Sequence, residues 1–202
     1  MRSEPGTVGR GRLTTVLARA KPLLGWWLPI AMLCPSLVWL ALDHAAWPWD
    51  QAWFGAQTVA LYETLRGDPL GWPSALAHTT PLKPPAVAWI GEFFVPLGMA
   101  LGSVDAALLL SIWMTHVVVL IVVYRALMAL SGGRMLAAAA GTLVTGASPL
   151  FIGLSTQYLA EASQTLAVAW FVWIIAETRG WGRPKLAAHL VAAMSFAMLA
   201  KT

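Results

Sequence analysis

The sequence is poor in charged residues, which make up 11% of its 202 positions, whereas hydrophobic residues make up 58%. Soluble domains carry about 25% charged and about 45–50% apolar residues. A single core in a chain of this length could not bury so much apolar surface. Disordered chains combine low hydrophobicity with high charge, which is the reverse pattern. We therefore expect an all-α polytopic membrane protein.

Asparagine is absent, and cysteine occurs once, at Cys34. The chain therefore has no N-glycosylation sequon and cannot form an internal disulfide. The net charge of +4 is dispersed along the sequence, so no nucleic-acid partner is expected. Glycine-rich phosphate loops, nucleophile elbows and CxxC pairs are also missing. The excess of arginine over lysine and the abundance of alanine fit a GC-rich bacterial genome.

Five apolar stretches are candidates for helices that cross about 30 Å of hydrocarbon. Residues 1–23, which precede the first of them, carry five cations and predict a basic cytoplasmic N-terminus. Residues 24–202 are expected to form one domain, multi-pass in the inner (plasma) membrane, with about five transmembrane helices. The stretches are Leu24–Leu42, Ala106–Tyr124, Met135–Leu154, Leu159–Ala176 and Leu186–Ala200.

A sixth apolar stretch, Pro85–Leu101, carries Glu92 at its centre and is interrupted by glycine and proline. If this stretch does not cross, ten cations lie inside and three lie outside; if it crosses, the numbers are six and seven. Because cytoplasmic loops are enriched in Lys and Arg, the first arrangement is favoured. Pro85–Leu101 is therefore predicted to be an amphipathic helix on the outer interface, within an external loop over residues 43–104.

The external loop is rich in acidic and tryptophan side chains, and a loop of this length is unusual for a mere connection. A functional surface, if the protein has one, is expected here. Within the loop, Gln51–Arg66 predicts a short helix, which Gly67-Asp68-Pro69 ends. The proline-rich stretch Pro69–Pro85 is expected to be extended.

Three charged residues allow two interpretations each. Asp50 is either the N-cap of the short helix or a partly desolvated general base. Lys83 is either a snorkelling interfacial lysine or a ligand for a lipid phosphate. Glu161 either complements a helix dipole or is a functional group beside an apolar span. His78 lies outside and could meet Asp50 or Lys83, whereas His116, in mid-span, is expected to be packed rather than a ligand.

Four motifs, taken in order, resemble the N-terminal part of the GT-C-fold glycosyltransferases that use lipid-linked sugars, such as protein O-mannosyltransferases and aminoarabinose transferases. The motifs are Pro48-Trp49-Asp50-Gln51, Lys83-Pro84-Pro85, Tyr158-Leu159-Ala160-Glu161 and Leu199-Ala200-Lys201-Thr202. The resemblance implies inverting transfer of a sugar from a polyprenyl-phosphate donor to a glycan, lipid or protein acceptor on the external face.

By this resemblance, Asp50 is the catalytic carboxylate, Lys83 holds the donor phosphate and Glu161 has a supporting polar role. Gln51, at the place of a second acid, and His78, from its external position, complete the predicted substrate-binding set. No metal ligand is assigned, although a divalent metal is compatible with the family.

Two departures from the family pattern leave other interpretations open. Gln51 and Leu82 stand where family members carry acids, which weakens the case for a bound metal and also fits a divergent, inactive member. The chain has fewer spans than the family enzymes, so we expect an N-terminal piece that is inactive alone. The alternative function is non-enzymatic, either a transporter fragment or an assembly partner. A transporter would place polar groups near the bilayer midplane, whereas the acids here gather at the outer interface.

Overall fold

The computed structural model describes residues 8–42, 46–79, 83–178 and 180–200. Every regular element within these ranges is a helix, which confirms the expected all-α class. In chain order the elements are α1 (Val8–Leu42), α2 (Trp49–Gly67), α3 (Trp72–His78), α4 (Ala86–Gly91), the 3₁₀ turn η1 (Glu92–Phe94), α5 (Val95–Leu101), α6 (Val104–Leu130), α7 (Met135–Gly146), α8 (Pro149–Leu154), α9 (Glu161–Glu177) and α10 (Arg183–Ala200).

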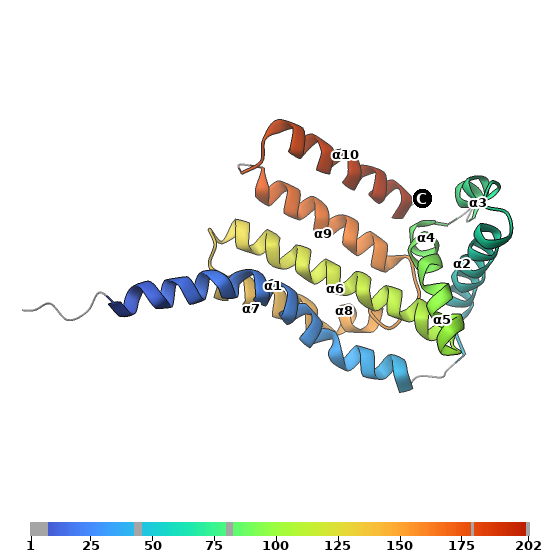
Figure 1. Ribbon diagram of the computed structural model, residues 1–202, viewed down its shortest axis with the longest axis horizontal. Helices are drawn as coiled ribbons and strands as arrows, with labels where there is room; N and C mark the ends of the chain where they lie inside the picture. Colours follow the sequence, from blue (N-terminus) through green and yellow to red (C-terminus); the bar gives the residue numbers. More distant parts are fainter. Residues whose placement is uncertain (1–7, 43–45, 80–82, 179, 201–202) are drawn as a thin grey trace, which may run out of the picture.

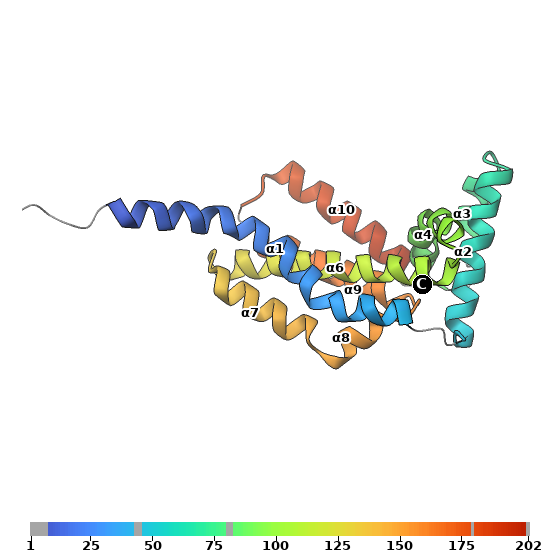
Figure 2. The same ribbon diagram turned by 60° about the horizontal axis from the view of Figure 1, so that its bottom comes forward.

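The longer helices form a lengthwise bundle, and α2 to α5 gather at one end of it (Figure 1). The central helix is α6, which packs against α1, α7 and α9, while α10 packs on α9. Helix α2 runs across the end of the bundle rather than along it (Figure 2). We call this end the α2 end and the other the opposite end.

Helix α6 lies at the centre because it is the most apolar of the long helices and can be covered on several sides. Leu108 and Leu120 on α6 are almost fully buried. The indole N–H of Trp113 donates to the backbone carbonyl of Leu33 on α1 at 2.8 Å. This bond satisfies a polar group inside the apolar core and fixes α1 against α6.

Two of the described helices are long and apolar enough to cross a membrane: Leu23–Leu42, with mean hydropathy 1.7, and Val104–Leu130, with mean hydropathy 2.5. Helix α9 has 17 residues and at a rise of about 1.5 Å per residue extends about 26 Å. That length is a little short of the hydrocarbon core. The fold class is therefore as expected, while two helices, rather than five, meet this length and hydropathy criterion.

The expected single helix Met135–Leu154 is wrong, because the structure breaks it into α7 and α8. Helix α7 ends at Gly146, and Pro149 begins α8, where its missing N–H costs nothing. The Ser148 hydroxyl caps α8 by accepting the Phe151 N–H at 3.2 Å. A serine-proline pair thus starts a new helix in a new direction.

The prediction of a short helix over Gln51–Arg66 is confirmed by α2, whereas the extended conformation expected between Pro69 and Pro85 is wrong at α3. Pro73 lies in the first turn of α3, where proline is favourable, and alanine and leucine follow it. Residues 80–82 of this stretch lie outside the described residues.

The stretch Pro85–Leu101 begins and ends at the α2 end, where α6 also starts (Figure 1). It forms α4, η1 and α5 rather than one continuous helix, and none of these runs the length of the bundle. This is the geometry that a non-crossing segment requires.

Candidate functional site

Helix α2 presents Asp50 in its first turn at the α2 end. The helix begins at Trp49, and no side chain caps it, so the N-cap interpretation of Asp50 is wrong. The carboxylate instead lies beside free amides of the first turn, where the helix dipole favours a negative charge. Its side chain is 57% exposed, so it is open to another molecule.

Lys83 forms an ion pair with Asp50, although 33 positions separate the two residues. Its Nζ atom lies 5.4 Å from the ring centre of Trp49, 5.1 Å from that of Trp53 and 5.4 Å from that of Phe54. The Lys83 side chain is 31% exposed. The lysine is thus held by a carboxylate and three rings of α2 rather than extended alone; we call this arrangement the Asp50–Lys83 pair.

The contacts within the Asp50–Lys83 pair are individually weak. An exposed ion pair contributes between about 0 and 1 kcal/mol, and a cation–π contact at an exposed site about 0.5–1 kcal/mol. A ligand anion can therefore displace the carboxylate from the ammonium at small cost. The pair is accessible and easily opened, as a binding site must be.

Gln51 points inward, next to Asp50, and is 8% exposed. Its side-chain oxygen accepts the backbone N–H of Tyr158 at 3.0 Å. The Tyr158 hydroxyl donates to the Val87 carbonyl at 3.1 Å and lies 2.8 Å from the Thr58 hydroxyl. The ring of Tyr158 stacks on that of Trp47, with 5.5 Å between the ring centres. Burial raises the pKa of the Tyr158 hydroxyl far above its ordinary value. These contacts join α2, α4 and the segment before α9.

The bond from the Tyr158 N–H engages the side-chain oxygen of Gln51 within the fold, and the predicted substrate-binding role of Gln51 stays a prediction. The sequence alone indicates no role for Tyr158, whose hydrogen bonds join α2, α4 and the segment before α9. In the sequence, Tyr158 is marked only by its place three positions before the first-turn acid Glu161.

Glu161 is the first residue of α9 and is exposed, so its expected place in a first turn is confirmed. It follows Tyr158 by three positions, and the Gln51–Tyr158 bond therefore brings the start of α9 near the start of α2. Within the described residues, no side-chain contact joins Glu161 to Asp50 or Lys83. Its role in substrate binding stays a prediction.

His78 occupies another part of the α2 end. It closes α3, and its Nδ1 lies 2.7 Å from the backbone carbonyl of Ser74. It lines a small pocket with Gln57 and Thr64, which lie about 10 Å or more along α2 from Asp50 at about 1.5 Å per residue. The structure thus brings Asp50 and Lys83 together and places His78 apart from them.

Glu92, expected on an interfacial helix, is 1% exposed. The indole N–H of Trp72 on α3 donates to one carboxyl oxygen at 3.2 Å, while the other oxygen has no partner among the described residues. Burial raises the pKa of Glu92 above its ordinary value, and the Trp72 bond opposes this rise in part. A second indole bond, from Trp89 to the Leu76 carbonyl at 3.1 Å, also joins α3 to α4. Together they close the loop that carries Lys83.

Among the described residues, no group of three or more His, Cys, Asp or Glu side chains is placed to hold a metal ion. The predicted Lys201-Thr202 pair and Leu82 lie outside the described residues. No protein-family model, curated protein or solved structure matches the chain. The family resemblance therefore depends on the ordered sequence motifs alone.

Proposed function

We propose that the chain forms part of an integral membrane glycosyltransferase that takes a sugar from a polyprenyl-phosphate donor on the external face. The observation that carries this proposal is the Asp50–Lys83 pair. The motifs assigned a carboxylate and a phosphate-binding cation to one reaction, and such groups must lie within one site. Their contact across 33 positions supports that requirement.

The chemistry follows from the charges of the two side chains. When the donor phosphate binds Lys83, the Asp50 carboxylate is released from its ion pair. It can then accept the proton of an acceptor hydroxyl, whose oxygen forms a bond to the anomeric carbon from the face opposite the phosphate. The bond from that carbon to the phosphate oxygen breaks, and its electron pair leaves with the polyprenyl phosphate. Lys83 stabilises the leaving charge, and the configuration inverts.

The proposed membrane arrangement uses α1, α6, α7 with α8, α9 and α10 as five crossings in the inner membrane, with residues 1–23 cytoplasmic. The break between α7 and α8 is tolerable because the Ser148 hydroxyl caps the free amide of Phe151 and Pro149 has no N–H to satisfy. Arg125, Arg134 and Lys185 lie at the opposite end, whereas Asp50 and Glu161 lie at the α2 end. This separation follows the positive-inside preference.

A non-enzymatic membrane protein remains the alternative. In its transporter form, polar groups would meet near the bilayer midplane. His116 on α6 is fully buried, with its Nδ1 2.9 Å from the Ile112 carbonyl and its ring edge-on to Phe151. The expectation that His116 is packed is confirmed. The accessible charged pair lies instead at the end of the bundle, which supports chemistry at the membrane surface over permeation.

Binding of a polyprenyl phosphate to the 202-residue chain in phosphatidylcholine nanodiscs tests the proposal. We expect Lys83→Ala to weaken binding of a short-chain polyprenyl phosphate about tenfold or more, because a charge-assisted hydrogen bond contributes about 1.5–3 kcal/mol. Fluorescence of the tryptophans around Lys83 provides the signal.

Arg66→Ala is the matched control, because Arg66 is an exposed cation at the other end of α2. It is expected to leave the affinity unchanged. An unchanged affinity in Lys83→Ala, or an equal loss in Arg66→Ala, would count against a phosphate site at Lys83.

A further inference from the structure

A second cluster of cations and rings lies at the opposite end of the bundle. The Arg125 guanidinium, near the end of α6, lies 5.9 Å from the ring centre of Trp26 on α1 and 5.6 Å from that of Trp173 on α9. The side chain is exposed. Within the described part of the chain it makes no ion pair and no hydrogen bond. Two rings therefore position the guanidinium, and none of its five N–H donors is bonded to a described residue.

Helix α10 and the turn before it add a second cation to this cluster. Lys185 Nζ lies 4.3 Å from the ring centre of Trp181. The centre of the Trp181 ring lies 4.4 Å from that of His189 and 5.2 Å from that of Trp173. Arg125 and Lys185 therefore contact one connected set of rings. The indole N–H of Trp173 is buried and has no acceptor among the described residues. Most polar groups of this cluster are therefore donors, and the described acceptor among them, Nδ1 of His189, already accepts the indole N–H of Trp170 at 3.3 Å.

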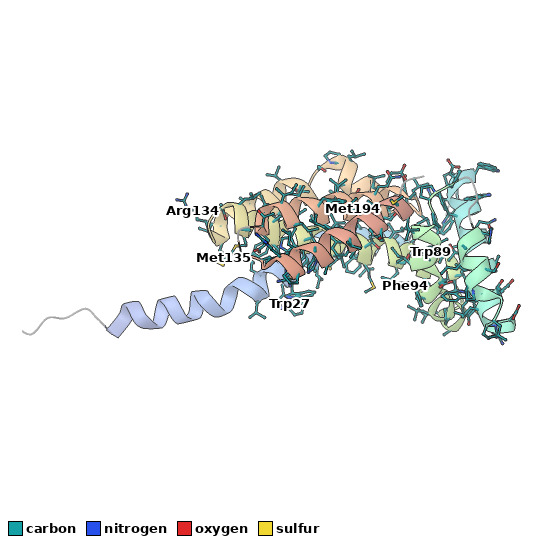
Figure 3. The ribbon with its side chains drawn as sticks, turned by 90° about the horizontal axis from the view of Figure 1, so that it is seen from above. Trp27, Trp89, Phe94, Arg134, Met135 and Met194 are labelled. Carbon is teal, nitrogen blue, oxygen red and sulfur yellow. The ribbon has the colours of Figure 1, made fainter. Side chains whose placement is uncertain are left out.

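All of these residues lie at one level of the bundle. Arg125 directly follows the predicted span Ala106–Tyr124, Lys185 directly precedes Leu186–Ala200, and Trp26 lies at the start of the first span. Tryptophan and arginine at span ends mark the depth of lipid headgroups. Arg125 lies 21 residues along α6 from its start at the α2 end, about 31 Å at about 1.5 Å per residue, so the cluster is remote from the Asp50–Lys83 pair. Figure 3 shows Arg134, the other cation of this end, at the end of the bundle away from Trp89.

We propose that Arg125, between Trp26 and Trp173, binds the phosphate of an anionic phospholipid headgroup, with Lys185 as the second cation. A guanidinium binds two phosphate oxygens at once and can stack on rings at the same time. The surroundings favour a lipid over free phosphate, because Trp26 is 50% exposed and the neighbouring Trp27 is 64% exposed. Such apolar surface beside the cation suits acyl chains.

The thermal unfolding midpoint of the chain in nanodiscs tests this site. We compare phosphatidylcholine alone with an equal mixture of phosphatidylcholine and phosphatidylglycerol. The mixture is expected to raise the midpoint by about 3 °C or more, because a ligand that binds only the folded state stabilises it. Arg125→Gln is expected to lose most of this rise, and Arg134→Gln, which removes an exposed cation at the same end, is expected to keep it.

Native mass spectrometry of the same samples supplies a readout that does not depend on stability. Wild type and Arg134→Gln are expected to retain one phosphatidylglycerol per chain, and Arg125→Gln is expected to lose it. Equal retention by Arg125→Gln, or equal loss by Arg134→Gln, would overturn the proposal. Inorganic phosphate added to phosphatidylcholine nanodiscs separates the two phosphate sources. An equal rise in the midpoint with phosphate alone would overturn the assignment to a lipid.

Discussion

Asp50 and Lys83 differ from the buried polar residues of the α2 end in being accessible and weakly held. Tyr158, Gln51 and Glu92 are buried and engaged with other elements. The buried group fixes the relative positions of α2, α3 and α4, and the exposed pair is displayed on the resulting surface. A side chain that can change partners on a rigid support is suited to binding and proton transfer.

The buried carboxyl of Glu92 predicts a pH dependence of stability. Because burial raises its pKa above 4.5, the folded chain holds this proton more tightly than the unfolded chain. The stabilisation is fully present below about pH 4.5 and is lost as the pH rises through the folded-state pKa. We expect Glu92→Gln, which stays neutral, to gain stability relative to wild type with increasing pH. Unfolding in detergent from pH 4 to pH 8 measures the difference; parallel curves would contradict it.

The separate residues of the site were predictable from the sequence, but their contact was not. Asp50 stood out as an acid among tryptophans after a span, and Lys83 as an external cation before two prolines. The contact between Asp50 and Lys83 depends on a loop that two indole hydrogen bonds close. The Trp72–Glu92 bond joins positions 20 apart, and the Trp89–Leu76 bond joins positions 13 apart. The spacing of apolar residues within one helix does not predict bonds over such separations. His78 lies in the same loop, but at the end of α3 and apart from Asp50 and Lys83.

At the scale of elements, the close approach of α4 to Tyr158 depends on Gly91. A Cβ atom at this position would lie 1.9 Å from the Tyr158 hydroxyl oxygen and 3.1 Å from a Thr58 methyl group. We expect Gly91→Ala to lower the free energy of unfolding by about 1–3 kcal/mol, because the buried tyrosine cannot move without losing its hydrogen bonds. Chemical unfolding in micelles measures the change.

Gly153→Ala on α8 is the matched control for this substitution, because nothing lies within 4 Å of its added Cβ. It is expected to be neutral or slightly stabilising, since alanine favours a helix. Equal losses in the two variants would show that the approach of α4 to Tyr158 contributes nothing.

Proline explains the element-scale differences between sequence and structure. The helix α2 was predictable because its apolar spacing ends at a glycine-aspartate-proline stop. The sequence predicts that Pro73 belongs to an extended stretch and Pro149 to a continuous span, whereas each lies in the first turn of a new helix. Proline stops one helix and starts another equally well. Which of the two occurs depends on the cap before it, such as Ser148.

At the scale of the whole molecule, sugar transfer at Asp50 on the external face requires that the α2 end faces outward and the opposite end faces the cytoplasm. Single cysteines at the exposed positions Ser74, Leu101 and Thr178 test this, in a chain whose own exposed Cys34 is replaced by alanine. An impermeant maleimide is expected to label Ser74→Cys and Leu101→Cys on intact cells, and Thr178→Cys only after permeabilisation. Labelling of Ser74→Cys and Leu101→Cys from different sides would mean that α4 and α5 cross the membrane.

If the Asp50 carboxylate acts in sugar transfer as proposed, its replacement must lower the rate of transfer. The measurement is release of polyprenyl phosphate from a polyprenyl-phosphate sugar, made with the complete reading frame that encodes this chain. We expect Asp50→Asn to lower the rate about 100-fold or more, because general-base catalysis contributes about 10²–10⁴-fold. Asp68→Asn, which changes an exposed acid beyond the other end of α2, should keep the wild-type rate. A wild-type rate in Asp50→Asn would contradict the account.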